Sequence, residues 1–461
     1  MPRIAVFFNS VETLRSGVLS WMLGRMVFQA RSPTMLSRRR VLNQWVIGAP
    51  SAMAFAGTES VAPAQISPED DAFLEEVERA SFLYFWEQAD PRTGLVKDRC
   101  DTTKSPDKGI VASVAATGFG LTALCIGHKR GYASANAITL RVVASLEFLW
   151  KKMPTHRGFF FHWANVNTGE RIWDSEVSSI DTAILLCGVL TCREYFHHQG
   201  IINLANAILN RVDWSWVAED TSLLSHGWMP EGGFLPYRWD IYSELMMMYL
   251  LGLGSPTHPL PDGAWNAWKR TTFDYEGLRY IGSFAPLFVH QYSQAWFDFR
   301  GKHDQYADYF KNSVISTEVH RRFCLELSSR FPDYSDDLWG ITASDSQHGY
   351  VIWGGPPEMG PIDGTVVPSA AGGSLPFLPQ ATLRVLKTIR TRYAPRAWTR
   401  YGFVNAFNPL KNWYDTDVIG IDTGVTMVMA ENLRTGLVWE TFMKSREVQH
   451  ALQRAGFKND T

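Results

Sequence analysis

Helical patterns follow one another without interruption from Ser67 to the end of this chain, and this succession constrains the fold most. The first helix is signalled by Ser67-Pro68-Glu69-Asp70, which offers an N-cap, a first-turn proline and an acidic third position. Behind it, residues recur at helical spacing up to Gln88, namely Phe73, Val77, Ser81, Tyr84 and Phe85. Similar patterns cover about 113–130, 134–152, 178–198, 201–212, 240–252, 261–271, 286–299, 304–328, 376–392, 422–434 and 440–455.

The spacing of these patterns favours one all-α domain over residues 66–461. No run of alternating strands interrupts them, although Gly158 to Trp163 with Asn167-Thr168-Gly169 predicts a small hairpin. A linker rich in Pro, Gly and Ser is absent after residue 66, and so is the fixed-period repeat of a helical solenoid. We therefore expect about twelve helices, paired and wound into an (α/α)6 toroid.

Residues 1–65 differ in composition from the rest of the chain and are predicted to form an N-terminal extension with an export signal. Ser37-Arg38-Arg39-Arg40-Val41-Leu42, followed by a modestly apolar stretch, is typical of a twin-arginine signal. Cleavage is expected after Ala56 or Ala64, and translation from Met35 is an alternative to Met1. The predicted location is periplasmic or secreted, with no membrane span in the mature form. The alternative is an arginine-flanked helix that anchors the protein.

Charge and cysteine content exclude several classes of partner. The chain has 44 Lys and Arg against 46 Asp and Glu, so it lacks the basic field that collects nucleic acid or an anionic membrane. Its five cysteines match neither a disulfide framework nor the spacing of zinc-binding cysteines. Motifs for a nucleophilic serine, a nucleotide or zinc are missing, so neither a cofactor nor a metal is expected.

The first segment that could carry chemistry runs from Arg171 to Thr182 and concentrates three carboxylates at the start of a helix. Asp174 and Glu176 lie beside Trp173, and Asp181 follows them. Ser178 and Asp181 also fit a capping box, so capping is an alternative explanation for Asp181 alone. Aromatic faces such as that of Trp173 stack on sugar rings, and the chain carries 18 Trp, 16 Tyr and 27 Phe.

A second segment, Arg238-Trp239-Asp240-Ile241-Tyr242-Ser243-Glu244, precedes an apolar run. If the helix has already begun, Asp240 and Glu244 lie four apart on one face, where mutual repulsion would raise the pKa of one of them. Such an acid is suited to general acid catalysis. The alternative is a pair of solvated acids with Arg238 as their counter-ion.

A third, largely apolar helical pattern contains four polar residues, His290, Gln291, Gln294 and Asp298. Polar side chains in such a setting need hydrogen-bond partners. They are expected either to bind hydroxyl groups or to form a buried network near Arg300. Asp345 and Asp363 in the long loop from Phe331 to Ser374 are further candidates, although Asp363 fits an ordinary Asp-Gly turn. With the serine, nucleotide and zinc motifs absent, the remaining candidate groups are carboxylates and aromatic side chains. Glycoside hydrolases use a pair of carboxylates for catalysis.

The chain from about Phe73 to Phe457 resembles the glycoamylase-like domain family, which includes bacterial endo-β-1,2-glucanases and the processing domain of cyclic β-1,2-glucan synthases. The resemblance rests on motifs in order: Tyr84-Phe85-Trp86-Glu87, Ala115-Ala116-Thr117-Gly118-Phe119-Gly120, Ser175 to Ala183, Arg238 to Glu244, Phe288-Val289-His290-Gln291-Tyr292, Thr342-Ala343-Ser344-Asp345 and Ser374-Leu375-Pro376-Phe377. It implies an (α/α)6 toroid that hydrolyses a β-1,2-linked glucan with inversion. Gln294 stands where many members are expected to carry His.

We therefore predict an inverting β-glucanase in which Glu244 protonates the substrate, directly or through a bridging hydroxyl. The base is expected among Asp174, Glu176 and Asp181, because neighbours four apart on a helix are too close for inversion. The expected substrate-binding residues are Trp173, Arg238, Trp239, Asp240, Tyr242, His290, Gln291, Tyr292, Gln294 and Asp345. A polysaccharide lyase on a similar toroid and a non-catalytic glucan-binding protein are the alternatives.

Overall fold

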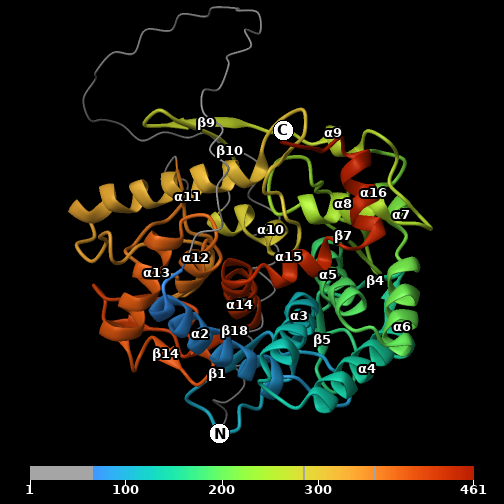
Figure 1. Cartoon of the computed structure of the whole chain (residues 1–461), viewed down its shortest axis with the longest axis horizontal. Helices are drawn as coiled ribbons and strands as arrows, with labels where there is room; N and C mark the ends of the chain where they lie inside the picture. The colour runs from blue at the N-terminus through green and yellow to red at the C-terminus, as the bar shows by residue number, and fades with distance from the viewer. Residues whose placement is uncertain (1–65, 284–285, 357–359, 461) are drawn as a thin grey trace, which may run out of the picture. The chain divides into compact units, whose positions relative to one another are not determined.

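The computed structural model describes residues 66–283, 286–356 and 360–460, so the predicted export signal lies outside the described residues. A little under half of the described chain is helical (Figure 1). None of its helices is long and apolar enough to cross a bilayer. The α-helices are α2 (Pro68–Glu87), α3 (Val114–Arg130), α4 (Ala135–Lys151), α5 (Ser179–Tyr195), α6 (Gln199–Asn210), α7 (Trp214–Ala218), α8 (Met246–Gly254), α9 (Ala264–Ala267), α10 (Tyr292–Trp296), α11 (Tyr309–Glu326), α12 (Pro368–Gly372), α13 (Pro379–Thr388), α14 (Gly420–Arg434), α15 (Leu437–Phe442) and α16 (Arg446–Arg454).

Four of the predicted helices differ from the structure, and one of them, the pattern at 261–271, is helical only over α9 (Ala264–Ala267). The pattern at 286–299 is a 3₁₀ turn (Leu287–His290) followed by α10, and the pattern at 440–455 is the pair α15 and α16. The pattern at 240–252 begins as a helix only at Met246. Before it, the Lys269 N–H donates to the Asp240 carbonyl at 2.7 Å, and the Tyr242 N–H donates to the Lys269 carbonyl at 2.8 Å. This pairing holds 240–242 extended, so Asp240 and Glu244 do not share a helix face.

Short strand pairs lead into the helices. β2 (Val111–Ser113), β6 (Val177–Ser178) and β18 (Asp417–Ile419) continue directly into α3, α5 and α14. Their antiparallel partners are β5 (Trp163–Asn165), β7 (Gly227–Met229) and β1 (Arg99–Asp101), and β7 also pairs β8 (Gly233–Phe234). Where a hairpin was predicted over Gly158 to Trp163 with Asn167-Thr168-Gly169, β3 (Thr155–His156) pairs with β4 (Phe159–Phe160) around Gly158, and Ala164 bridges Arg171 around the predicted turn. The remaining pairs are β9 (Thr272–Tyr275) with β10 (Leu278–Ile281), β11 (Lys302–His303) with β19 (Lys458–Asn459), β12 (Ser344–Ser346) with β13 (Gly349–Val351), β14 (Trp398–Thr399) with β15 (Gly402–Phe403), and β16 (Phe407–Asn408) with β17 (Trp413–Tyr414).

Helices α3 and α5 pack in parallel at glycine contacts. A Cβ atom on Gly188 would lie 2.1 Å from the Gly118 carbonyl oxygen, so only glycine allows this approach. Further along both helices, the Sγ atoms of Cys125 and Cys192 lie 3.6 Å apart. Since both contacts advance in the same direction, the two N-termini lie at one end.

Helix α14 runs alongside α3 in the same direction. Gly420 lies against Ala116, and Gly424 lies against Phe119. At the other end, the Arg130 Nε–H donates to Glu431 Oε2 at 2.9 Å. In Figure 1, α3 and α14 lie closer to the centre of the view than α4, α6, α11 and α16. The N-termini of α3, α5 and α14 therefore share one end, and the strand pairs β2–β5, β6–β7 and β1–β18 lie there.

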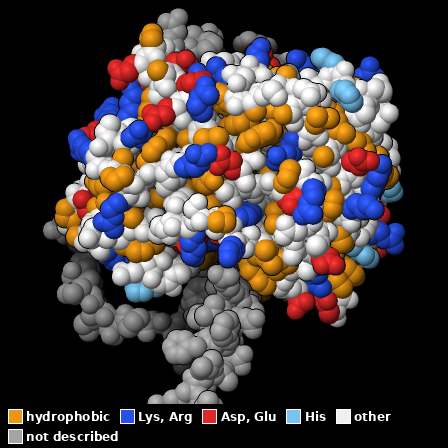
Figure 2. Space-filling model, turned by 90° about the horizontal axis from the view of Figure 1, so that it is seen from below, with side chains coloured by type: hydrophobic (Ala, Val, Ile, Leu, Met, Phe, Trp, Pro, Cys, Tyr) orange, Lys and Arg blue, Asp and Glu red, His pale blue; other side chains and the backbone are white. Residues whose placement is uncertain are grey.

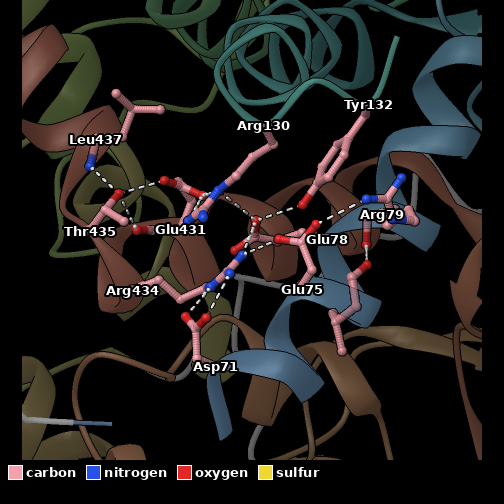
Figure 3. A network of polar contacts seen from close by, with 12 residues as sticks. Asp71, Glu75, Glu78, Arg79, Arg130, Tyr132, Glu431, Arg434, Thr435 and Leu437 are labelled. Carbon is pink, nitrogen blue, oxygen red and sulfur yellow. Dashed lines mark hydrogen bonds and ion pairs between the residues drawn. The ribbon is translucent and has the colours of Figure 1, made fainter. Parts of the chain in front are cut away.

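A buried ion network ties α2, α3 and α14 together at the opposite end (Figure 3). The Arg434 side chain is 2% exposed and donates to Asp71 Oδ1 at 2.8 Å, Glu75 Oε2 at 3.0 Å and Glu78 Oε2 at 2.7 Å. The Tyr132 hydroxyl also donates to Glu78 Oε2, at 3.2 Å. Burial and the neighbouring carboxylate of Glu431 raise the pKa of Glu78 well above its usual value.

The face shown in Figure 2 mixes Lys, Arg, Asp and Glu side chains with apolar ones over its described part. This mixture agrees with the near balance of 44 basic and 46 acidic residues. The face shown presents no continuous field of one sign to a charged polymer.

Arg434→Met is expected to lower the free energy of unfolding by about 3–5 kcal/mol, because the buried Glu78 carboxyl loses its 2.7 Å contact and keeps only Arg130, 3.7 Å away. Glu78→Gln, in contrast, keeps the hydrogen bonds from Arg434 and Tyr132 and should cost about 1 kcal/mol. Urea unfolding of both variants measures the difference. Equal losses would show that the network does not depend on the Arg434 charge.

Candidate active site

One acidic group lies at the N-terminus of α5 and surrounds His162. His162 Nδ1 lies 2.9 Å from Glu176 Oε1, and His162 Nε2 lies 3.7 Å from Asp181 Oδ2. Asp181 is the third residue of α5. Its N–H donates to Ser178 Oγ at 3.2 Å, and the Ser178 hydroxyl donates to Asp181 Oδ2 at 2.5 Å. The predicted capping by Ser178 is therefore present, and the Asp181 side chain remains 13% exposed.

His162 carries a positive charge in this group. Burial opposes that charge, but the carboxylates of Asp181 and Glu176 outweigh burial and raise the pKa of His162 to about 9. Although burial acts against it, the His162 charge lowers the pKa of Glu176. Burial raises the pKa of Asp181 despite His162 and Ser178. At neutral pH an imidazolium therefore lies between two carboxyl groups.

Glu244 lies in the turn that begins α8. Its carbonyl accepts the Ser293 hydroxyl at 2.7 Å, and Ser293 Oγ accepts the Met247 N–H at 3.0 Å, which fixes the backbone of the turn. The side chain is surrounded by protein but keeps part of its surface exposed. Burial, with a further contribution from the Asp181 charge, raises the pKa of Glu244 to about 7. Asp240 does not contribute to this shift.

A second acidic group surrounds Asp422, the third residue of α14. The Asn405 Nδ2–H donates to Asp422 Oδ2 at 2.5 Å, and Asn405 Oδ1 accepts the Asp345 N–H at 2.7 Å. Arg99 binds the carboxylate of Asp345 and lies 3.3 Å from Asp417 Oδ2. Burial raises the pKa of Asp422 to about 7, and the charge of Asp345 adds to the effect.

Two tyrosines connect the acidic groups. Tyr292, at the start of α10, lies within electrostatic range of Asp422, Glu244 and Asp181. Tyr350, on β13, lies within range of Asp422, Asp345 and Glu244. Burial and these carboxylates raise the pKa of both phenols, so both hydroxyls stay neutral donors. Glu176, Asp181, Glu244, Tyr292 and Asp345 are the predicted residues that the structure brings to this site.

Trp173 and Asp174 lie at the rim in a strained turn. Their φ angles of 58° and 49° are in the left-handed region, and Trp173 is 51% exposed. The ring of Trp173 meets that of Trp163 edge-on at 5.9 Å, and Trp163 stacks on His162 at 4.0 Å. An aromatic path therefore runs from the solvent-exposed rim to the first acidic group.

Four predicted binding residues are instead buried and bonded to protein. The Tyr242 hydroxyl and His290 Nδ1 lie 3.0 Å apart, and burial lowers the pKa of His290 to about 3. Gln291 Nε2 donates to the Ala370 carbonyl at 2.9 Å, and Gln294 Nε2 donates to the Tyr309 carbonyl at 2.8 Å. The structure therefore does not bring these four side chains to the candidate site as free groups, because each bonds to another protein group in the core.

The 238–240 segment also differs from the prediction. Arg238 pairs with Glu219, and Asp240 lies 3.4 Å from Lys269 Nζ at the surface. Trp239 stacks on His226 at 4.0 Å and donates from Nε1 to Ser179 Oγ at 3.0 Å, which supports the start of α5. Arg238 is therefore not the counter-ion of Asp240 or Glu244.

His162, Asp422, Tyr350 and Arg99 were not predicted as site residues. A sequence signal for Asp422 exists, because Ile180-Asp181-Thr182 recurs as Ile421-Asp422-Thr423. Both tripeptides occupy the same positions at the start of a helix. No comparable signal marks the other three residues.

Two groups could provide three ligands each to a metal ion. They are His162 with Glu176 and Asp181, and Asp345 with Asp415 and Asp417, and within each group the ligand atoms lie within 4.8 Å of one another. In the first group His162 supplies a positive charge, and in the second Arg99 binds two of the three carboxylates. A metal ion would have to displace these cations.

Comparison with known proteins places the chain among relatives of similar fold. Residues 236–446 match the glycoamylase family model, described as "Putative glucoamylase". A solved structure of the same description, from Bacteroides caccae, is 30% identical over 85% of this chain and 100% of that chain, with a TM-score of 0.79. An endo-β-1,2-glucanase from Chitinophaga pinensis, in complex with sophorotriose and glucose, is 28% identical over 86% of this chain and 99% of that chain, also with a TM-score of 0.79.

A curated relative is the exo-β-1,2-glucooligosaccharide sophorohydrolase of Parabacteroides distasonis, 27% identical over 424 residues. This match covers 84% of the present chain but only 58% of the length of that relative. With 30% identity to the Bacteroides caccae protein over most of both chains, the chain belongs to the glycoamylase-like family.

Titration of the histidine ring signals by NMR is expected to show His162 charged until the pH approaches about 9. His320, whose Nε2 accepts the Ile341 N–H at 2.9 Å, is the internal control, because burial alone lowers its pKa to about 4. Glu176→Gln should lower the pKa of His162 and leave that of His320 unchanged. An uncharged His162 at neutral pH would contradict the described electrostatics.

Proposed function

We propose that the chain is a glycoside hydrolase that cleaves β-1,2-linked glucan by an inverting acid–base mechanism. The observation that carries this proposal is the cluster of partly exposed carboxyl groups whose pKa values burial raises to about 7, Glu244 and Asp422 among them. Such acids can donate or accept a proton at neutral pH. The Parabacteroides and Chitinophaga relatives, which are named for β-1,2-linked substrates, support the choice of linkage. The predicted export signal favours the periplasm as the compartment.

The proposed architecture is an (α/α)6 toroid with α3, α5, α8, α10, α12 and α14 as the inner helices. Parallel contacts support this ring: Phe119 and Thr122 of α3 meet Tyr292 and Trp296 of α10 in the same order. The N-termini of α5, α10 and α14 and the turn before α8 supply Asp181, Tyr292, Asp422 and Glu244. Converging helix N-termini favour negative charge, which suits a site rich in carboxylates.

Glu244 is the proposed general acid. Burial keeps a large fraction of its carboxyl group protonated near neutral pH. It would protonate the glycosidic oxygen directly or through a bridging substrate hydroxyl. Protonation of the leaving group avoids expulsion of an alkoxide, which is the main chemical barrier to hydrolysis.

Asp181 is the proposed base among the three acids expected from the sequence. It is the one whose charge acts on Glu244, whereas Asp174 lies at the exposed rim and Glu176 is bonded to His162. Asp422 is a second candidate, because it lies on the other side of Tyr292 and Tyr350. Either carboxylate would accept a proton from the attacking water.

The rim turn at Trp173 is proposed to stack on a sugar residue outside the reaction centre. Two consecutive non-glycine residues with positive φ cost about 1–3 kcal/mol each, and such strain is often found at ligand sites. The exposed Trp173 ring offers a flat apolar face of the kind that packs on pyranose rings. Binding there would direct a glucan chain along Trp163 toward the acids.

Purified protein is expected to release reducing ends from β-1,2-glucan faster than from laminarin, cellulose or starch. Glu244→Gln should lower kcat by about 10²–10⁴-fold, because the amide cannot donate the proton. Since the acid must be protonated, wild-type kcat/KM should fall as the pH rises above about 7. Asp240→Asn is the matched control, because Asp240 pairs with Lys269 at the surface.

Unchanged activity of Glu244→Gln would remove this residue from the acid role. Unsaturated products that absorb in the ultraviolet would support a lyase instead. Glucan binding without release of reducing ends would support the non-catalytic alternative.

Asp181→Asn and Asp422→Asn distinguish the two candidate bases. Loss of the base should lower kcat by about 10²–10⁴-fold, and sodium azide should restore cleavage in that variant because the anion needs no deprotonation. Attack on the face opposite the β bond would form an α-glucosyl azide, detectable by NMR. The other variant should show no azide rescue. Absence of rescue in both would contradict both assignments.

A further inference from the structure

Tyr350 combines a fixed backbone with a side-chain hydroxyl that the protein leaves unused. It lies on β13, directly opposite Asp345 on β12. Directly opposite residues of an antiparallel pair project from the same face, so the phenol follows the Asp345 carboxylate toward Arg99. Among the described residues, its hydroxyl has no hydrogen-bond partner, although the ring lies within range of Asp422 and Glu244.

The β12–β13 hairpin is held in place from both sides. Within it, the Ser346 hydroxyl donates to the Gly349 carbonyl at 2.7 Å, and Trp353 Nε1 donates to Ser344 Oγ at 2.8 Å. Outside it, the two ends of the Asn405 amide join the Asp345 N–H to the Asp422 carboxylate. The position of Tyr350 relative to Asp422 is therefore set by hydrogen bonds and does not depend on a flexible loop.

Because the Tyr350 hydroxyl has no hydrogen-bond partner among the described residues, it is available to a ligand. The phenol stays neutral because burial, together with the nearby carboxylates, raises its pKa, so it can donate a hydrogen bond without adding charge to the site. A sugar hydroxyl is a partner that accepts this bond and can donate in turn to Asp422 or Glu244. Tyr292, which lies near Tyr350, has the same neighbours and extends the donor surface toward Asp181.

We propose that Tyr350 is a substrate-positioning residue whose hydroxyl donates a hydrogen bond to the sugar unit bound between Glu244 and Asp422. The hairpin, anchored to Asp422 by Asn405, holds this donor near the two acids and aligns the glycosidic bond with Glu244. The inference rests on the proposed glycosidase function and specifies one contact within it.

Tyr350→Phe removes only the hydroxyl and tests the contact. On β-1,2-glucan, kcat/KM is expected to fall about tenfold, the effect of one lost uncharged hydrogen bond. Because the phenol does not titrate near neutral pH, the loss of kcat/KM should be the same at every pH. The fall of kcat/KM above about pH 7 should therefore occur at the same pH as in the wild type. Tyr275→Phe is the matched control, since its hydroxyl lies on the β9–β10 hairpin and donates to Glu326 Oε2 at 2.6 Å. Its activity should equal that of the wild type.

Binding of a β-1,2-linked glucotriose to Glu244→Gln, measured by calorimetry, provides a readout that does not require turnover. Adding Tyr350→Phe should weaken this binding about tenfold, whereas adding Tyr275→Phe should not. Wild-type activity and affinity in Tyr350→Phe, or an equal loss in Tyr275→Phe, would overturn the inference. A wild-type protein that neither cleaves nor binds β-1,2-glucans would instead overturn the proposed function.

Discussion

The close parallel packing of α3, α5 and α14 is the constraint on which the rest of the structure depends. Gly118 and Gly188 bring two helix backbones into direct contact, and Gly424 allows α14 to pack on Phe119. A side chain at Gly118 or Gly188 would push the helices apart and separate their N-termini. The distances within the acidic site are therefore set by contacts that lie inside the helices, away from the reacting groups.

The chemistry of the site follows from this convergence. Asp181 and Asp422 occupy the third position of their helices, where the N-terminal dipole favours a carboxylate. Burial acts in the opposite direction and raises the pKa of both groups. His162 and Arg99 place a cation beside each acidic group, so several carboxyl groups can share one cleft without prohibitive repulsion.

Much of the fold could be predicted from the sequence, because helices such as α3 and α5 are long apolar runs that begin at serine N-caps, Ser113 and Ser178. The site was predicted only in part. Glu176, Asp181 and Glu244 stand beside apolar helices, whereas His162 lies in the bend between β4 and β5 and Tyr350 lies on the short strand β13, and neither place has a periodicity of its own. The core hydrogen bonds of Gln291 and Gln294 could not be foreseen, since a polar residue in an apolar helix joins core helices as readily as it faces a ligand. Pairing between 240–242 and Lys269 is non-local, so the late start of α8 could not be read from local pattern.

Strands of two to four residues, rather than one continuous sheet, form the described strand pairs, and this has a consequence for how such a protein can diversify. A two-stranded hairpin such as β9–β10 or β12–β13 is a separate module that can be lengthened, shortened or exchanged without breaking the hydrogen bonds of another strand pair. Grafting a different hairpin onto residues 344–351 would reshape one side of the acidic site while the helical frame stayed intact. A scaffold of this kind can acquire new chain-length or linkage preferences through local insertions, one wall at a time.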